Sequence, residues 1–141
     1  MKTISLEKIV QKLEETSDAD YFYLNTVTGE FEWMSNGEYM EADEELAERI
    51  EMSDDYVRLP TQYDIHEYLI MRDFAESIED DNIREKLCRT LTGSRVHRRF
   101  KDELIFLGIR EEYYAFRNTV YWDIAEEWCK DHKIPYIGTE V

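Results

Sequence analysis

The chain has 141 residues, of which 43% are hydrophobic and 13% aromatic, and its formal net charge is −16. A chain of this length can bury the core of one ordinary domain, and its apolar content argues against a disordered chain. No apolar run approaches the roughly 20 residues that a membrane helix needs, and the first residues show no secretory signal. We therefore expect a single domain over 1–141, no membrane contact and a cytoplasmic location.

The charge is distributed unevenly along the chain. Residues 1–81 contain 23 acidic and 6 basic side chains, whereas residues 82–141 contain 10 acidic and 11 basic ones. This predicts an acidic α/β part over about 1–81 and a near-neutral helical part over about 82–141. The two cysteines, Cys88 and Cys129, lie in helical patterns without a CxxC motif, which favours reduced, buried thiols over a disulfide.

The first part of the chain predicts helices around a small sheet. The expected elements are a helix over 5–15, a β-hairpin over 21–34, a helix over 41–51 and a short strand near 56–59. Ser5 is the expected N-cap of the first helix. In the hairpin, Phe31 and Trp33 alternate with glutamates, so we expect them on a buried face. Pro60 would lie at a sheet edge or just beyond its end.

The second part predicts helices only. The expected elements are helices over about 63–79, 82–91, 95–107 and 111–131. Asn82 with Glu85 is typical of a capping box, and Gly93 followed by Ser94 indicates one helix end and a new cap. Strands early and helices late indicate an α+β fold, with a small antiparallel sheet packed against several helices and a helical C-terminal half.

A basic cluster on the predicted helix 95–107 is the strongest candidate for a binding site. Its members are Arg95, Arg98, Arg99 and Lys101, which fall outside the apolar stripe of that helix, and His97, which lies near them. Guanidinium groups suit phosphate or carboxylate, and a histidine adds a titratable donor. The simplest interpretation is that the arginines pair with the acidic first half and join the late helices to the early ones. The alternatives are a partner surface, and a nucleic-acid or small-anion site.

Two further interpretations concern nucleic acids. The helices on either side of residues 92–94 allow a helix-turn-helix arrangement with 95–107 as the recognition helix. The net charge of −16 repels DNA and weighs against it. Alternatively, the acidic surface could imitate a nucleic-acid backbone and bind a basic protein, although a solvated acidic face is the simpler interpretation.

An aromatic stretch near the C-terminus offers a second set of contact residues. Phe116 and Trp128 fit the apolar stripe of the last helix, which indicates core positions. Three other aromatic residues fall partly off that stripe beside Arg117, and they are Tyr114, Tyr121 and Trp122. Exposed aromatic side chains next to arginine are typical of binding hot spots.

Catalytic and metal motifs are missing from the sequence. There is no HExxH, zinc spacing, EF-hand order, phosphate loop or nucleophile elbow, so we assign no catalytic residue, no metal ligand and no cofactor. Enzymes without local motifs exist. An enzyme that acts on an anionic substrate held by the same arginines therefore stays an alternative.

Several short segments together resemble a bacterial family known as uncharacterised protein family 0158. They are Tyr23-Leu24 with Gly29-Glu30, Leu91-Thr92-Gly93, Arg99-Phe100-Lys101, Tyr114-Ala115-Phe116-Arg117 and Ala125-Glu126-Glu127-Trp128. The resemblance runs over nearly the whole chain, with Val96-His97 standing where the family pattern has Ala-Phe. It implies a small acidic cytoplasmic protein of unassigned function and supplies no catalytic residues.

These observations favour a non-enzymatic interaction or regulatory protein that binds a protein partner or an anionic group through the basic helix. The first alternative is a nucleic-acid-associated protein, through backbone contact or acidic mimicry. The second alternative is the enzyme for an anionic substrate. A homo-oligomer is compatible with the sequence.

Overall fold

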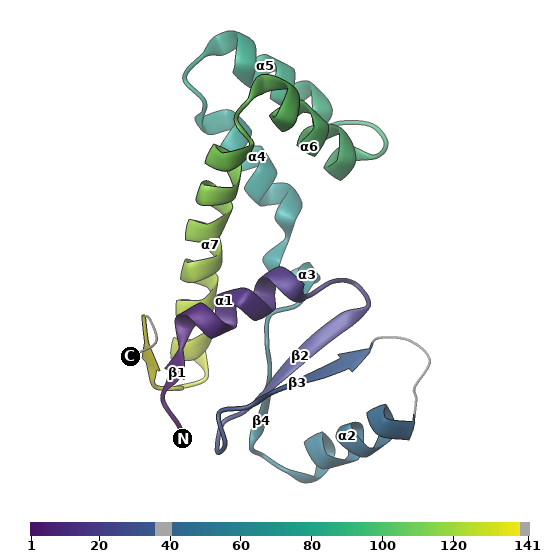
Figure 1. Cartoon of the computed structure of the whole chain (residues 1–141), viewed down its shortest axis with the longest axis vertical. Coiled ribbons are helices and arrows are strands. Elements are labelled where there is room, and N and C mark those ends of the chain that lie inside the picture. Colours follow the sequence, from purple (N-terminus) through teal and green to yellow (C-terminus); the bar gives the residue numbers. More distant parts are fainter. Residues whose placement is uncertain (36–40, 139–141) are drawn as a thin grey trace. The chain divides into compact units, whose positions relative to one another are not determined.

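The computed structural model describes the backbone of residues 1–35 and 41–138 and the side chains of residues 1–35 and 44–138. It confirms the predicted α+β fold, because a small antiparallel sheet is combined with helices and the C-terminal half is helical (Figure 1). The chain divides into unit 1, Met1–Ile65 with Tyr121–Val141, and unit 2, His66–Val120. The sequence indicated a change of character near residue 81, whereas these boundaries follow residues 65 and 120.

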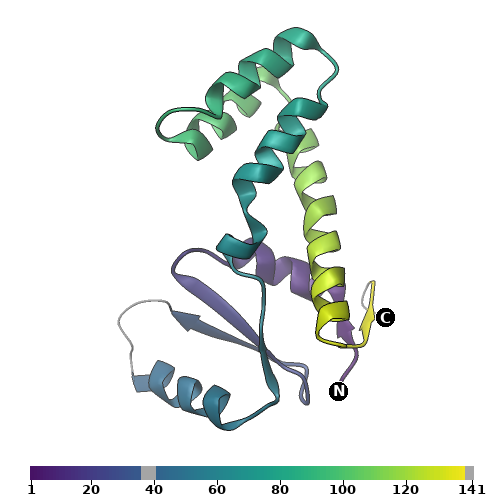
Figure 2. The same ribbon diagram turned by 180° about the vertical axis from the view of Figure 1, so that it is seen from behind.

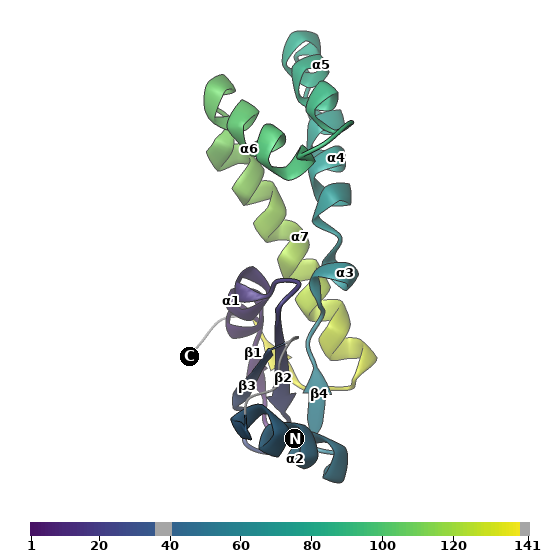
Figure 3. The ribbon, with the colours of Figure 1, turned by 90° about the vertical axis from the view of Figure 1, so that its right-hand side faces the viewer.

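The sheet of unit 1 has the strand order β3-β2-β4. Its strands, β2 (Asp20–Asn25), β3 (Phe31–Ser35) and β4 (Tyr56–Arg58), are antiparallel, and Figure 3 shows β4 at the edge beside β2. Phe22 lies opposite Trp33 and Leu24 lies opposite Phe31, so these four side chains share one face. Trp33 is nevertheless 50% exposed, and its Nε1 donates to the Asp20 carboxylate over 2.7 Å. The expectation that Trp33 is buried is therefore wrong.

Helix α1 (Leu6–Glu15) lies against the Phe22 face, with the Lys12 ammonium 5.2 Å from the Phe22 ring centre. Its buried stripe is the predicted one: Leu6, Ile9, Val10 and Leu13. Ser5 precedes the helix in an extended conformation, but its hydroxyl is buried, caps no helix N–H group and has no hydrogen-bond partner among the described residues. The other helices that belong wholly to unit 1 are α2 (Glu41–Met52) and α3 (Gln62–Ile65).

A second, two-stranded sheet was not expected from the sequence. Strand β1 (Ile4–Ser5) pairs in parallel with β5 (Tyr136–Ile137). Two-residue strands are too short to show an alternating pattern, and only folding brings these distant segments together. Among the described residues, no helix combines the length and the apolar character needed to span a membrane.

Unit 2 is built from α4 (Glu67–Ser77), α5 (Asp81–Thr90), α6 (Val96–Leu107) and the first part of α7 (Arg110–Asp131). The helix predicted over 63–79 is two helices, because His66 adopts a left-handed backbone with φ 55° between α3 and α4. Asp80, rather than Asn82, caps α5 by accepting hydrogen bonds from the N–H groups of Asn82 and Ile83.

The core of unit 2 is aromatic. Tyr113 of α7 is fully buried, and its ring meets the rings of Phe74 and Phe100 edge-on at 5.4 and 5.2 Å. Figure 2 shows that α5 and α6 lie side by side and run in opposite directions. This is an antiparallel hairpin, whereas the helices of a helix-turn-helix cross at about 90–120°. The helix-turn-helix prediction is therefore not supported.

Candidate binding surface on the α5–α6 hairpin

The loop between α5 and α6 is held by one member of the predicted basic cluster. The Arg99 guanidinium donates to the carbonyl oxygens of Thr92 at 2.6 Å, Arg89 at 3.3 Å and Ser94 at 3.4 Å. The end of a helix leaves carbonyl oxygens without intrahelical partners, and a guanidinium can satisfy several at once. Arg99 is therefore occupied in closing this loop.

The N-cap of helix α6 is Arg95 rather than the predicted cap Ser94. Arg95 has a left-handed backbone with φ 54°, and its side chain caps no helix N–H group. Its carbonyl oxygen accepts a hydrogen bond from the Arg99 N–H over 3.0 Å, which starts the helix. Left-handed geometry is costly for a residue with a Cβ, so the loop holds Arg95 in a strained conformation.

The exposed basic side chains at this end of α6 form a surface that we call the basic tip, and its members are Arg95, His97 and Arg98. With respect to the described part of the chain, the side chains of Arg95 and His97 make no hydrogen bond or ion pair. Arg98 is 77% exposed and lies 4.0 Å from Asp102, the limit of an ion pair. Such a pair contributes little to stability because water screens it. The basic tip is therefore available for a ligand.

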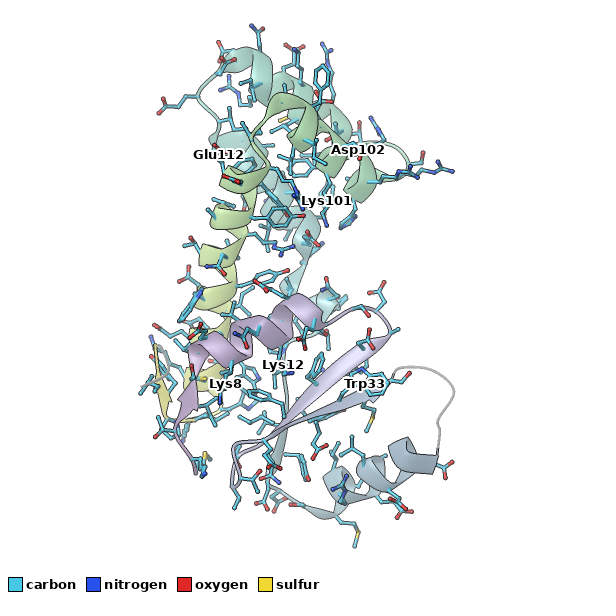
Figure 4. The ribbon with its side chains drawn as sticks, in the orientation of Figure 1. Lys8, Lys12, Trp33, Lys101, Asp102 and Glu112 are labelled. Atoms are coloured by element: carbon cyan, nitrogen blue, oxygen red, sulfur yellow. The ribbon has the colours of Figure 1, made fainter. Side chains whose placement is uncertain are left out.

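The other basic candidates surround a carboxylate, in an arrangement that we call the Glu67 cluster. Glu67 Oε1 lies 3.2 Å from Lys101 Nζ and 3.6 Å from an Arg117 nitrogen, and it accepts a hydrogen bond from the Tyr113 hydroxyl over 3.1 Å. The Glu67 side chain is only 12% exposed. Figure 4 shows Lys101 on the side of α6 that faces α4 and α7. The cluster therefore joins three helices of unit 2.

Electrostatics explains why Glu67 stays ionised there. Burial by itself would raise the pKa of Glu67, but the charge and hydrogen bond of Lys101, the charge of Arg117 and the Tyr113 hydroxyl lower the pKa below its ordinary value. Lys101 and Arg117 are therefore structural partners of Glu67, although the sequence made them candidate binding residues.

The expectation that Arg95, Arg98 and Arg99 pair with the acidic first half is thereby corrected. Within the described residues, Arg98 and Arg99 find partners inside the hairpin, and among the basic candidates it is Lys101 and Arg117 that pair with a carboxylate of the first half. The sequence did not single out Glu67. No local signal distinguished it, because Glu67 is one of many acidic residues and fell inside the predicted helix 63–79.

The three aromatic candidates also differ in burial. Tyr114 is half-buried, with the guanidinium carbons of Arg117 and Arg110 at 4.6 and 5.3 Å from its ring centre. Tyr121 is 1% exposed in unit 1, so it is a core residue and not a contact residue. Trp122 is half-buried in unit 1.

Cysteine and metal chemistry find little support in the described structure. Cys88 and Cys129 are free. Burial, with a contribution from Glu126, raises the pKa of Cys129 to about 11, so this thiol stays protonated and unreactive at neutral pH. No group of three or more His, Cys, Asp and Glu side chains suited to a metal ion occurs among the described residues.

Comparison with known proteins adds no family assignment. No protein family model, curated protein or solved structure matches this chain. Function is therefore inferred from the geometry of the site.

Proposed function

We propose that this protein is a non-enzymatic binding module that holds an anionic group of a protein partner on the basic tip. The observation that carries the proposal is the difference in pairing within the predicted cluster. Arg99 and Lys101 are engaged by carbonyl oxygens and by Glu67, whereas Arg95 and Arg98 present their charge to solvent beside the exposed imidazole of His97.

Charge distribution supports the same conclusion. Unit 1 contains 22 acidic and 7 basic residues, a formal charge of −15, whereas unit 2 contains 11 and 10, a charge of −1. An anionic ligand therefore meets less repulsion at unit 2 than the net charge of the chain suggests. Because Arg99 holds the α5–α6 loop, the backbone that carries the tip is fixed before binding, which lowers the entropic cost of association.

The other hypotheses lack an observation of comparable weight. Helices α5 and α6 do not cross as the helices of a helix-turn-helix do (Figure 2), which removes one argument for contact with a nucleic-acid backbone. No arrangement of the described side chains assigns a catalytic role. Membership of uncharacterised protein family 0158 stays a proposal that depends on the order of the matching segments.

Affinity capture from native lysate tests the proposal. The variant R95N/R98Q removes two tip charges, and asparagine tolerates the left-handed backbone at position 95. The matched control R72Q/R110Q removes two charges elsewhere in unit 2. Partners retained by wild type and control but lost by R95N/R98Q would support the proposal. The same partners on all three proteins would contradict it.

A further inference from the structure

The outward face of α6 carries more than basic residues. Arg98, Asp102, Ile105 and Phe106 are spaced i, i+4, i+7 and i+8, so they lie on one side of the helix. All four side chains are exposed, whereas Phe100 and Leu104 on the opposite side are fully buried.

The apolar part of this face is unusual within unit 2. Ile105 is 62% exposed and Phe106 is 79% exposed. The structure describes every residue of unit 2, and no other large hydrophobic residue there is exposed to a comparable degree. Single exposed hydrophobic residues are common on protein surfaces, but an adjacent aliphatic and aromatic pair beside a charged site is typical of an interaction surface.

The spacing along the helix defines two zones. Arg98 and Ile105 are seven residues apart, which corresponds to about 10 Å at the rise of an α-helix. The face thus presents a cationic zone at the start of α6 and an apolar zone near its end, with Asp102 between them. A ligand that satisfies both zones must carry anionic and apolar groups about two helical turns apart.

We propose that this face docks an acidic amphipathic helix of a protein partner, with carboxylates at Arg95 and Arg98 and apolar side chains on Ile105 and Phe106. This inference rests on the proposed function and specifies the partner's chemistry. Charge complementarity selects the occupant, because Arg95 and Arg98 call for carboxylates and Ile105 and Phe106 call for apolar side chains, and an acidic amphipathic helix presents both.

Two synthetic helical peptides of equal net charge test the inference. One carries glutamates on one face and leucines on the other, and the second has glutamine in place of each leucine. Fluorescence anisotropy should show that the wild-type chain binds the first peptide. The variant I105Q/F106Q should weaken this binding about tenfold or more, because both apolar contacts of the face are lost. The control V27Q/M52Q, which changes two exposed apolar residues of unit 1, should leave it unchanged.

The outcomes separate this inference from the proposed function. If both peptides bind equally and R95N/R98Q abolishes binding, the basic tip binds anions but the docking inference is overturned. If neither peptide binds, the docking inference is also overturned, and the capture experiment decides the proposed function independently. Binding to phosphatidylserine vesicles through Ile105 and Phe106, or dimerisation abolished by I105Q/F106Q, would equally overturn it. Circular dichroism should show wild-type helix content in each variant.

Discussion

The Glu67 cluster and the basic tip both contain basic side chains, which share a nearly buried carboxylate in the cluster and face solvent at the tip. Around Glu67, two cations and a tyrosine hydroxyl converge on one carboxylate that is 12% exposed. At the tip, Arg98 is 77% exposed and has one distant carboxylate. A cation enclosed with its partner holds the fold together, whereas a cation in water contributes little stability and is free to bind. Lys101 and Arg98, three positions apart on one helix, thus differ in pairing and in exposure.

The largest effect is expected from breaking the Glu67 cluster. E67A leaves Lys101, Arg117 and the Tyr113 hydroxyl without their shared acceptor, which should lower the free energy of unfolding by about 2–3 kcal/mol. Urea denaturation measures the change. The control E76A removes an exposed carboxylate from the same helix and should cost less than about 0.5 kcal/mol. Equal losses for the two variants would show that the cluster does not stabilise unit 2.

The Glu67 contribution should also depend on pH. Because the pKa of Glu67 is lower in the folded protein than in the unfolded chain, its stabilising effect is present above the unfolded pKa of about 4.3 and is lost as pH falls through the folded pKa. The difference in unfolding free energy between wild type and E67Q should therefore narrow below about pH 4. Urea titrations from neutral to acidic pH measure this difference. If the difference between wild type and E67Q stayed constant with pH, the lowered pKa of Glu67 in the folded protein would be contradicted.

A smaller effect is expected at the loop that carries the tip. R99Q removes a guanidinium that bonds the carbonyl oxygens of Arg89, Thr92 and Ser94, and it should lower the unfolding free energy by about 1 kcal/mol. Protection of the α5–α6 loop from hydrogen exchange should fall as well. R98Q, on the same helix, should change the unfolding free energy by less than about 0.5 kcal/mol. If R98Q were as destabilising as R99Q, the hydrogen bonds of Arg99 would not stabilise the fold more than the exposed side chain of Arg98 does.

The smallest effect has the opposite sign. R95N places a residue that tolerates left-handed geometry and accepts helix N–H groups where Arg95 is strained, so it should raise the unfolding free energy by about 0.5–1 kcal/mol. Thermal unfolding measures the gain, and R95K, which keeps the charge and a long unbranched side chain, serves as the comparison. A clear loss of stability in R95N would mean that the Arg95 side chain supports the fold.

The positions of the elements were largely predictable. The stripe of α1, the hairpin around Gly29 and the buried positions Phe100 and Leu104 followed from apolar periodicity, which reflects local geometry. Helix caps were less predictable. Asp80 and Asn82 are both good capping residues two positions apart, and only the backbone conformation decides between them.

The sequence by itself determined that the chain has an α+β fold and that basic residues gather on one helix, because periodicity and composition depend on neighbouring residues. The tertiary structure decided which of those residues are engaged. Glu67 precedes Lys101 by 34 positions and Arg117 by 50, and a single glutamate at such a separation leaves no local pattern. Burial and pairing depend on how helices pack, so the separation of Arg98 from Lys101 could be read only from the folded protein.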